Sequence, residues 1–233
     1  MSQFNPNLVG NHGITTETQV GPNTPVAQIE PIINSRSAEV YDADSLAQII
    51  EYPLRKPCVE LWNKGIRTIS SSANKKDLQR GYSYLTLDWS TLSDENRQIA
   101  LANATRVIPT KNDAEKISFQ QENMHTQNRV VWVNQYPTSE NDGKGEVVIA
   151  VPLQADTKAE VIEKATEEIV NKFKRQPAIW VKEYTLDDVK TMYGMGTEED
   201  ITPEDFSDTG FYYDASKGKF FHSKDEFTLK YGD

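Results

Sequence analysis

Two stretches of the chain require the same order of elements, and this order constrains the fold more than any single motif does. Residues 66–108 have the pattern of a strand, a polar loop, a second strand, a helix and a short apolar segment. Residues 129–182 repeat the strand, polar loop, strand and helix, and end in one more strand. Because each amphipathic helix must bury one face against the strands, the sequence predicts an α+β fold of two ββα-like halves, with a mostly antiparallel sheet and helices on one of its faces.

The strongest local patterns lie in the second half. EVVIAVPL at 146–153 is typical of a central strand, and an amphipathic helix is predicted over 157–175, with Thr157 as its N-cap and Glu160 completing a capping box. The other predicted strands are 66–70, 82–89, 129–136 and 178–182. Three further helices are predicted to begin with Asp44 as a cap, with Pro57 at the first helical position, and with Ser93 as a cap.

Composition divides the chain into three parts. Residues 1–40 are rich in Asn, Pro, Gly and Thr and poor in large apolar side chains, so we expect a flexible or disordered N-terminal arm. Residues 41–182 contain the predicted α+β core domain. Residues 183–233 contain an acidic segment and a predicted aromatic hairpin, which we expect to pack on the core.

The net charge of −10 is unevenly distributed. Residues 183–214 contain ten acidic side chains and one basic side chain, whereas residues 55–80 contain seven basic and two acidic ones. The acidic segment is expected to serve as a solvated loop, as a contact for a basic partner, or as a contact for the chain's own basic segment. The overall acidity argues against nucleic-acid binding, since phosphates would be repelled.

Several classes of protein have no support in the sequence. Cys58 is the only cysteine, and the three histidines are isolated, so we predict no disulfide framework, no metal site and no cofactor. No apolar run has the length of a membrane-spanning helix, and the N-terminal residues lack a secretory signal pattern. We therefore expect a cytoplasmic protein without a membrane partner, and leave delivery into another cell by a signal-less route open.

A thiol hydrolase is one enzymatic hypothesis. Cys58 would lie in the first turn of the predicted helix at 57–65, where the helix dipole lowers a thiol pKa. His125 and Asn134 follow in the chain, and this order is similar to that of papain-like hydrolases, although the neighbouring residues match no papain-like signature. The competing interpretation is a small core residue, because Cys58 shares a helix face with Leu61 and Trp62.

An anion site is the second enzymatic hypothesis. The stretch GIRTISSSANKKDLQRG, 65–81, has no internal glycine and so cannot form a glycine-rich phosphate loop. Ser71 or Ser72 could instead cap a short helix whose free N–H groups hold a phosphate-bearing small molecule, as in a transferase or nucleotide-binding protein. The predicted anion-binding residues are Ser70, Ser71, Ser72, Asn74, Lys75 and Lys76. The alternative is a solvated connection between two strands.

Neither hypothesis supplies a complete catalytic constellation, so the leading interpretation is not an enzyme. The charge segregation and the aromatic hairpin indicate a non-catalytic intracellular module that binds a protein partner, as a regulator, an inhibitor or a delivered effector. Consecutive aromatic residues would project from both faces of the hairpin, and one face would be a contact surface. The predicted partner-binding residues are Phe211, Tyr212, Tyr213, Phe220 and Phe221.

Overall fold

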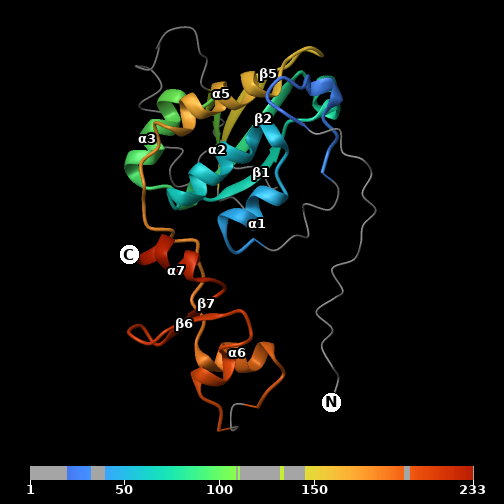
Figure 1. The fold of residues 1–233 in the computed structure, drawn as a ribbon. Coiled ribbons are helices and arrows are strands. Elements are labelled where there is room, and N and C mark those ends of the chain that lie inside the picture. Colours follow the sequence, from blue (N-terminus) through green and yellow to red (C-terminus); the bar gives the residue numbers. More distant parts are fainter. Residues whose placement is uncertain are drawn as a thin grey trace.

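A five-stranded sheet with the strand order β1-β2-β5-β3-β4 organises the larger part of the molecule (Figure 1). The computed structural model describes residues 20–32, 40–108, 110, 132–133, 145–196 and 200–232. The strands are β1 (Thr68–Ser72), β2 (Tyr82–Asp88), β3 (Arg106–Ile108), β4 (Trp132–Val133), β5 (Glu146–Pro152), β6 (Tyr212–Asp214) and β7 (Lys219–Phe221). The α-helices are α1 (Ala43–Gln48), α2 (Tyr52–Asn63), α3 (Asp94–Asn103), α5 (Ala159–Val170), α6 (Leu186–Met192) and α7 (Lys224–Tyr231).

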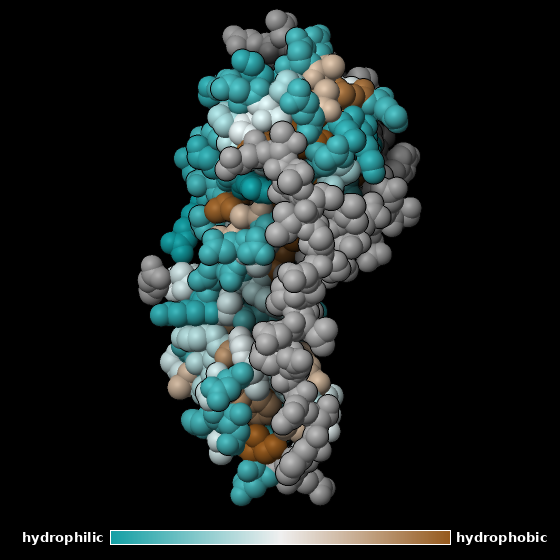
Figure 2. Space-filling view, turned by 45° about the vertical axis from the view of Figure 1, so that its right-hand side comes forward, coloured by the Kyte–Doolittle hydropathy of each residue, from teal (hydrophilic) through white to brown (hydrophobic). Residues whose placement is uncertain are grey.

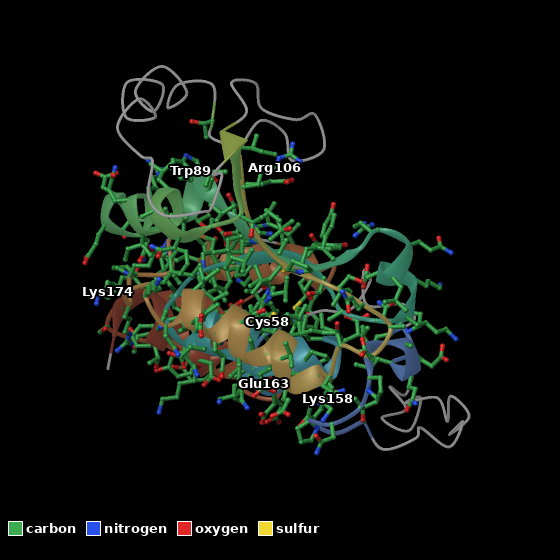
Figure 3. The ribbon with its side chains drawn as sticks, turned by 90° about the horizontal axis from the view of Figure 1, so that it is seen from above. Cys58, Trp89, Arg106, Lys158, Glu163 and Lys174 are labelled. Carbon is green, nitrogen blue, oxygen red and sulfur yellow. The ribbon has the colours of Figure 1, made fainter. Side chains whose placement is uncertain are left out.

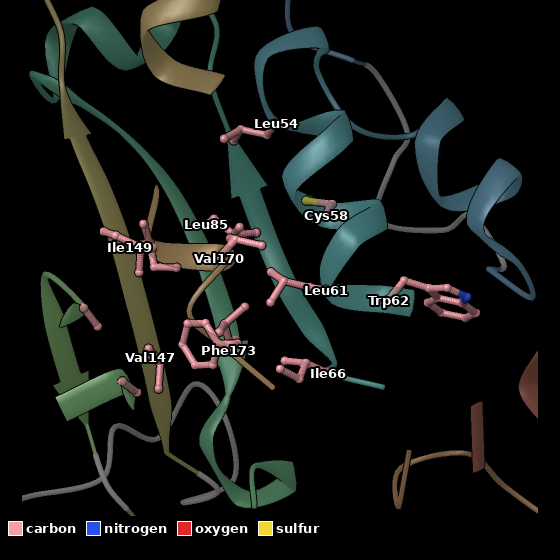
Figure 4. Packing of buried hydrophobic residues seen from close by; sticks show 14 of the residues in the cluster. Leu54, Cys58, Leu61, Trp62, Ile66, Leu85, Val147, Ile149, Val170 and Phe173 are labelled. Carbon is pink, nitrogen blue, oxygen red and sulfur yellow. The ribbon is translucent and has the colours of Figure 1, made fainter. Parts of the chain in front are cut away.

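The sheet is mostly antiparallel, and its helices cover one face, which confirms the predicted α+β class. The pairs β1-β2, β2-β5 and β5-β3 are antiparallel, and only β4 joins in parallel, at the edge beyond β3. Strand alternation directs Leu85 and Leu87 of β2, and Val147 and Ile149 of β5, into one core beneath α2 and α5 (Figure 4). The opposite face stays partly exposed, for example at Tyr82.

The second half departs from the predicted order of strands. β4 pairs with β3 rather than with β5, and the rest of the predicted strand 129–136 lies outside the described residues. Residues 178–182 form no strand: the Ala178 N–H donates to the carbonyl of Leu229 in α7, and the Trp180 ring lies 5.1 Å from that of Trp62. The buried residues of this run, Ala178 and Val181, thus belong to a segment that contacts α2 and α7, whereas Ile179 is exposed.

Part of the predicted N-terminal arm is folded. In residues 20–32, Val26 and Ile29 are buried, and the short 3₁₀ helix η1 (Val26–Gln28) lies against the start of α5. The N–H groups of Ala159 and Glu160 donate to the carbonyls of Thr24 and Pro22, at 2.9 Å each. The prediction of a flexible segment is therefore wrong for residues 20–32, because this segment caps a helix of the core. Residues 1–19 and 33–39 lie outside the described residues.

These contacts also correct the predicted helix starts. α5 begins after Lys158, and the Thr157 hydroxyl accepts from the Gln154 N–H instead of capping the helix. Asp42, two residues before the predicted Asp44, caps α1 by accepting from the Ser45 N–H at 2.7 Å. Ser93 caps α3 as predicted.

Helix α2 begins five residues earlier than predicted. Tyr52 is its first residue, Pro53 occupies the N-terminal turn, and Pro57 lies inside the helix. A proline there removes one intrahelical hydrogen bond. The burial of Leu54, Cys58 and Leu61 against the sheet offsets this loss, since each is at most 1% exposed.

Residues 183–232 form a smaller C-terminal unit at the other end of the molecule from most of the sheet, with α6 farthest out and α7 next to the main core (Figure 1). The predicted hairpin is present as β6 and β7. Its neighbouring residues Phe220 and Phe221 point to opposite sides. Phe220 is buried with Val189 and Phe206 in a small cluster, whereas Phe221 belongs to the main core. The hairpin therefore joins two hydrophobic cores.

Candidate functional site

Cys58 lies in the interior and not at a helix N-terminus. Its side chain is fully buried on the middle of α2 (Figures 3 and 4). Burial raises the pKa of the Cys58 thiol to about 12, and the nearby Glu51 carboxyl adds to the rise while a hydrogen bond with Ser71 opposes it. The predicted low thiol pKa is wrong, because α2 begins six residues before the cysteine. His125 and Asn134 lie outside the described residues, so nothing in the described structure brings the three residues together.

The serine-rich stretch forms β1 and the turn into the 3₁₀ helix η3 (Lys75–Gln79). The cap of η3 is Asn74 and not Ser71 or Ser72. The Asn74 Oδ1 accepts from the Lys76 N–H at 2.9 Å, and its Nδ2 donates to Glu51 Oε1 at 2.9 Å and to Ser72 Oγ at 3.0 Å. Asn74 thus ties the turn to the start of α2.

The N–H groups that an anion would need are bonded within the chain. The Asn74 N–H donates to the Asp77 carboxylate at 3.0 Å, and the Lys75 N–H donates to the Ile29 carbonyl at 2.9 Å. Ser72 Oγ also donates to Asp77, at 2.6 Å, and the Lys75 ammonium pairs with Glu30. Ser70 lies on the exposed edge strand, and Lys76 is exposed. The buried carboxylate of Asp77 therefore occupies the position where the hypothesis places a ligand.

Glu51 is a buried carboxyl at the centre of this polar cluster. It is 8% exposed, precedes α2, and accepts hydrogen bonds from the Asn74 side chain and the Ile32 backbone. Burial raises its pKa above the ordinary value of 4.5, although these hydrogen bonds oppose the rise. The cluster joins the 20–32 segment, α2 and η3, and its contacts are typical of a structural polar network.

The hairpin aromatics mostly face inward. Phe220 and Phe221 are buried. Tyr213 packs on Phe220 with ring centroids 4.7 Å apart, and Tyr212 packs on Phe227 at 5.5 Å. Phe211 contacts the Tyr184 ring at 5.8 Å. Both faces of the hairpin therefore serve internal packing, and the five predicted partner-binding residues do not form an open aromatic surface.

Three exposed apolar side chains of the C-terminal unit lie instead together at the end of α6, apart from the exposed Tyr231 of α7. Met192, Tyr193 and Met195 are 54%, 45% and 36% exposed, and we call these three residues the α6 tip. The lower end of Figure 2, where α6 lies, shows apolar surface next to hydrophilic surface. These residues are not among the predicted contact residues. The signal in the sequence was the run MYGM, which continues apolar side chains past the buried Val189 to the glycine that ends the helix.

Acidic side chains surround the α6 tip in the sequence and on neighbouring turns. Exposed carboxylates lie on α6 and on the 3₁₀ helix η6 (Pro203–Phe206) with the residues that follow it; they are Asp187, Asp188, Glu204, Asp205 and Asp208. Asp188 accepts from the backbone and side chain of Thr185, and Asp205 does the same with Thr202, which lowers the pKa of both carboxyls. Asp188 and Asp205 are therefore ionised at neutral pH.

The basic and acidic segments do not pair with each other in the described residues. Lys56 of the basic segment pairs with Glu167 at 2.7 Å, and Arg67 pairs with Asp88 at 3.7 Å. In the acidic segment, Glu183 pairs with Lys230 at 3.0 Å. No ion pair within the described ranges thus joins residues 183–214 to residues 55–80.

The described part of the chain shows neither a metal-binding cluster nor a membrane-spanning helix. No group of three or more His, Cys, Asp or Glu side chains there is arranged to hold a metal ion. None of the described helices is long and apolar enough to cross a membrane.

Comparison with known proteins yields no relative. No protein-family model, no curated protein and no solved structure matches this chain.

Proposed function

We propose that this chain is a non-catalytic intracellular protein-binding module, of the kind that serves as a regulator, an inhibitor or a delivered effector. The partner docks on the α6 tip of the C-terminal unit. The observation that supports this proposal is the group of three exposed apolar side chains, Met192, Tyr193 and Met195, next to ionised carboxylates.

An apolar centre with a charged rim is the usual composition of a protein interface. Met and Tyr are enriched in such centres, and acidic side chains belong to the rim. Each of the three side chains is exposed by one third or more. Burial of their remaining surface is worth about 1 kcal/mol each, or about 3 kcal/mol together, which corresponds to roughly a hundredfold in the dissociation constant.

The described geometry gives the enzymatic alternatives no comparable support. A thiol hydrolase needs an accessible thiolate, whereas the Cys58 thiol is buried and its pKa is raised to about 12. A phosphate site at η3 needs free N–H groups, whereas those of Asn74, Lys75 and Lys76 are all bonded to the chain itself.

The test compares two variants that remove similar amounts of exposed apolar surface. The first is Met192→Ser with Met195→Ser, at the α6 tip. The second, as a matched control, is Val161→Ser with Ile179→Ser, since these residues are 50% and 63% exposed on the larger part of the molecule. Each protein is cross-linked in the cells that produce it, the captured partner is identified, and the complex is reconstituted from purified components.

The proposal predicts that the wild type and the control bind the purified partner alike, and that the α6-tip variant binds it at least tenfold more weakly. A partner whose affinity is unaffected by the α6-tip variant would contradict the proposal, as would the failure of the wild type to retain any partner at low salt.

A further inference from the structure

We propose that the partner docks through a basic amphipathic segment, in which Lys or Arg side chains flank an apolar face that covers the α6 tip. This inference rests on the proposed function and specifies the chemistry of the partner.

In the α6 tip, the side chain of Tyr193 is held by contacts with the chain, and those of Met192 and Met195 are flexible. The Tyr193 ring lies 5.7 Å from the Phe206 ring, and its hydroxyl donates to the Thr209 carbonyl at 3.2 Å. Gly194 adopts a φ of +69° and turns the chain, so that the Met195 N–H donates back to the Lys190 carbonyl at 2.9 Å. Met192 and Met195 thus flank a fixed tyrosine in the sequence, and both are exposed. Methionine side chains adapt to irregular apolar surfaces, which suits a surface that receives a segment of another protein.

The rim of the α6 tip is negative on both sides. Asp188 lies on α6 one turn before Met192, and Asp187 precedes it in the first turn of the helix. Asp208 precedes Thr209, the residue whose carbonyl accepts from Tyr193, and Glu204 lies on η6, two residues before Phe206. The side chains of Asp187, Glu204 and Asp208 form no ion pair with any described residue, so their charge is available to a partner.

Charge excludes the other occupants of such an apolar surface. Nucleic-acid phosphates and anionic lipid headgroups would both be repelled by this rim. A second copy of the chain would place two acidic rims against each other, which opposes self-association through the α6 tip. A partner segment with Lys or Arg around its apolar side chains can pair with the carboxylates of the rim and pack on the apolar centre at the same time.

The test uses two synthetic amphipathic helical peptides with the same Leu pattern, one with Lys and one with Glu on its polar face. Binding to the full chain is measured by fluorescence anisotropy over a range of salt concentrations. Three variants are compared with the wild type: Met192→Ser with Met195→Ser; the rim variant Asp187→Asn with Glu204→Gln and Asp208→Asn; and the control Glu168→Gln with Ile179→Ser. The rim variant spares Asp188 and Asp205, which cap helices, and the control changes exposed residues outside the C-terminal unit.

We expect the Lys peptide to bind the wild type and the control equally, and the Met variant to bind it about tenfold more weakly. The rim variant should also bind more weakly, with a flatter salt dependence. The Glu peptide should not bind. Equal binding of the Lys peptide by all three variants, binding of the Glu peptide, or no saturable binding of the Lys peptide would each overturn the inference.

The peptide result is independent of the search for a native partner. A partner that needs the α6 tip but docks through a neutral or acidic segment would overturn this inference and leave the proposed function intact. The absence of any native partner that depends on the α6 tip would overturn both.

Discussion

Substitution of Gly65 by alanine should destabilise the fold by several times as much as the same substitution at Gly81. Both glycines have a positive φ, +72° and +82°, and alanine in that conformation costs about 1 kcal/mol or slightly more at either position. The two sites differ in their surroundings. A Cβ on Gly65 would lie 2.2 Å from the backbone oxygen of Gln176 and 3.3 Å from the Ala178 nitrogen, whereas a Cβ on Gly81 would meet nothing within 4 Å.

The obstacle at Gly65 is backbone, so relief requires the chain at residues 176–178 to move. That movement would strain two hydrogen bonds, from the Gln176 N–H to the Lys64 carbonyl at 2.9 Å and from the Ala178 N–H to the Leu229 carbonyl at 3.0 Å. Overpacking of this kind costs about 1–3 kcal/mol, which brings the expected total for Gly65→Ala to about 2–4 kcal/mol.

The measurement is urea unfolding of the wild type and both variants, followed by circular dichroism. In a chain of this size the difference between the variants, about 1–3 kcal/mol, corresponds to about 2–12 °C in Tm. Equal losses of unfolding free energy in the two variants would show that the contact between Gly65 and Gln176 does not constrain the fold, and would refute the reasoning.

Three further predictions concern buried polar groups. The Cys58 thiol, fully buried with a pKa raised to about 12, should resist a thiol reagent at pH 8 in the native protein and react once the protein is unfolded in urea; native reactivity equal to the unfolded rate would contradict its placement. Burial raises the pKa of Glu51, so the folded state holds that proton to higher pH than the unfolded state, and this carboxyl's contribution to the unfolding free energy should fall as pH rises above 4.5. Glu51→Gln should remove that part of the pH dependence. The measurement is the unfolding free energy of the variant and the wild type, from urea unfolding at several pH values between 4 and 8. If the two free energies change with pH in parallel, the raised pKa of Glu51 is refuted. Asn96→Ala should cost about 2–4 kcal/mol in urea unfolding, because it removes hydrogen bonds to Gln176 and Lys174 at 2.8 Å in a fully buried site, whereas Asn63→Ala on the exposed end of α2 should cost under about 1 kcal/mol.

Local patterns predicted the elements whose determinants lie within a few residues of one another. The apolar run that forms the central strand β5 and the Ser93 cap of α3 are of this kind, and both are confirmed. The start of α5 is not determined locally. The carbonyls of Pro22 and Thr24 cap this helix, and they belong to a segment more than a hundred residues earlier in the chain. No periodicity within 157–175 contains that information.

Rules that assign a residue type to one position of a helix gave wrong predictions where tertiary packing favoured another position. Pro57 fits a first helical position by itself, yet the apolar residues on both sides of it bury enough surface to carry α2 through the proline. α7 was missed, although Ser223 and Glu226 have the spacing of a helix start and the Ser223 hydroxyl accepts from the Glu226 N–H at 3.1 Å.

The sequence predicted the charge of the candidate surface but not the residues of its apolar centre. The count of acidic residues at 183–214 identified the segment. Which aromatic residues are buried depends on the placement of β6 and β7 between two clusters, and that follows from tertiary contacts. Sequence reasoning therefore assigned the contact role to Phe220 and Phe221, whereas the exposed residues are those of the α6 tip.

The hairpin that joins the two cores has a consequence for strand register. A shift of β7 by one residue would exchange Phe220 and Phe221, and each core would still receive a phenylalanine. Hydrophobicity therefore does not distinguish the correct pairing from the shifted one. Backbone contacts on two sides of β7 do so. In the turn, Asp214 accepts from the Ser216 hydroxyl and the Lys217 N–H, and Gly218, with a φ of +62°, donates its N–H to the Asp214 carbonyl at 2.8 Å. On the other side of β7, the backbones of Phe220 and Tyr184 exchange two hydrogen bonds, at 2.9 and 3.0 Å. Polar contacts of the backbone and the turn, and not the two rings, thus select which ring enters which core.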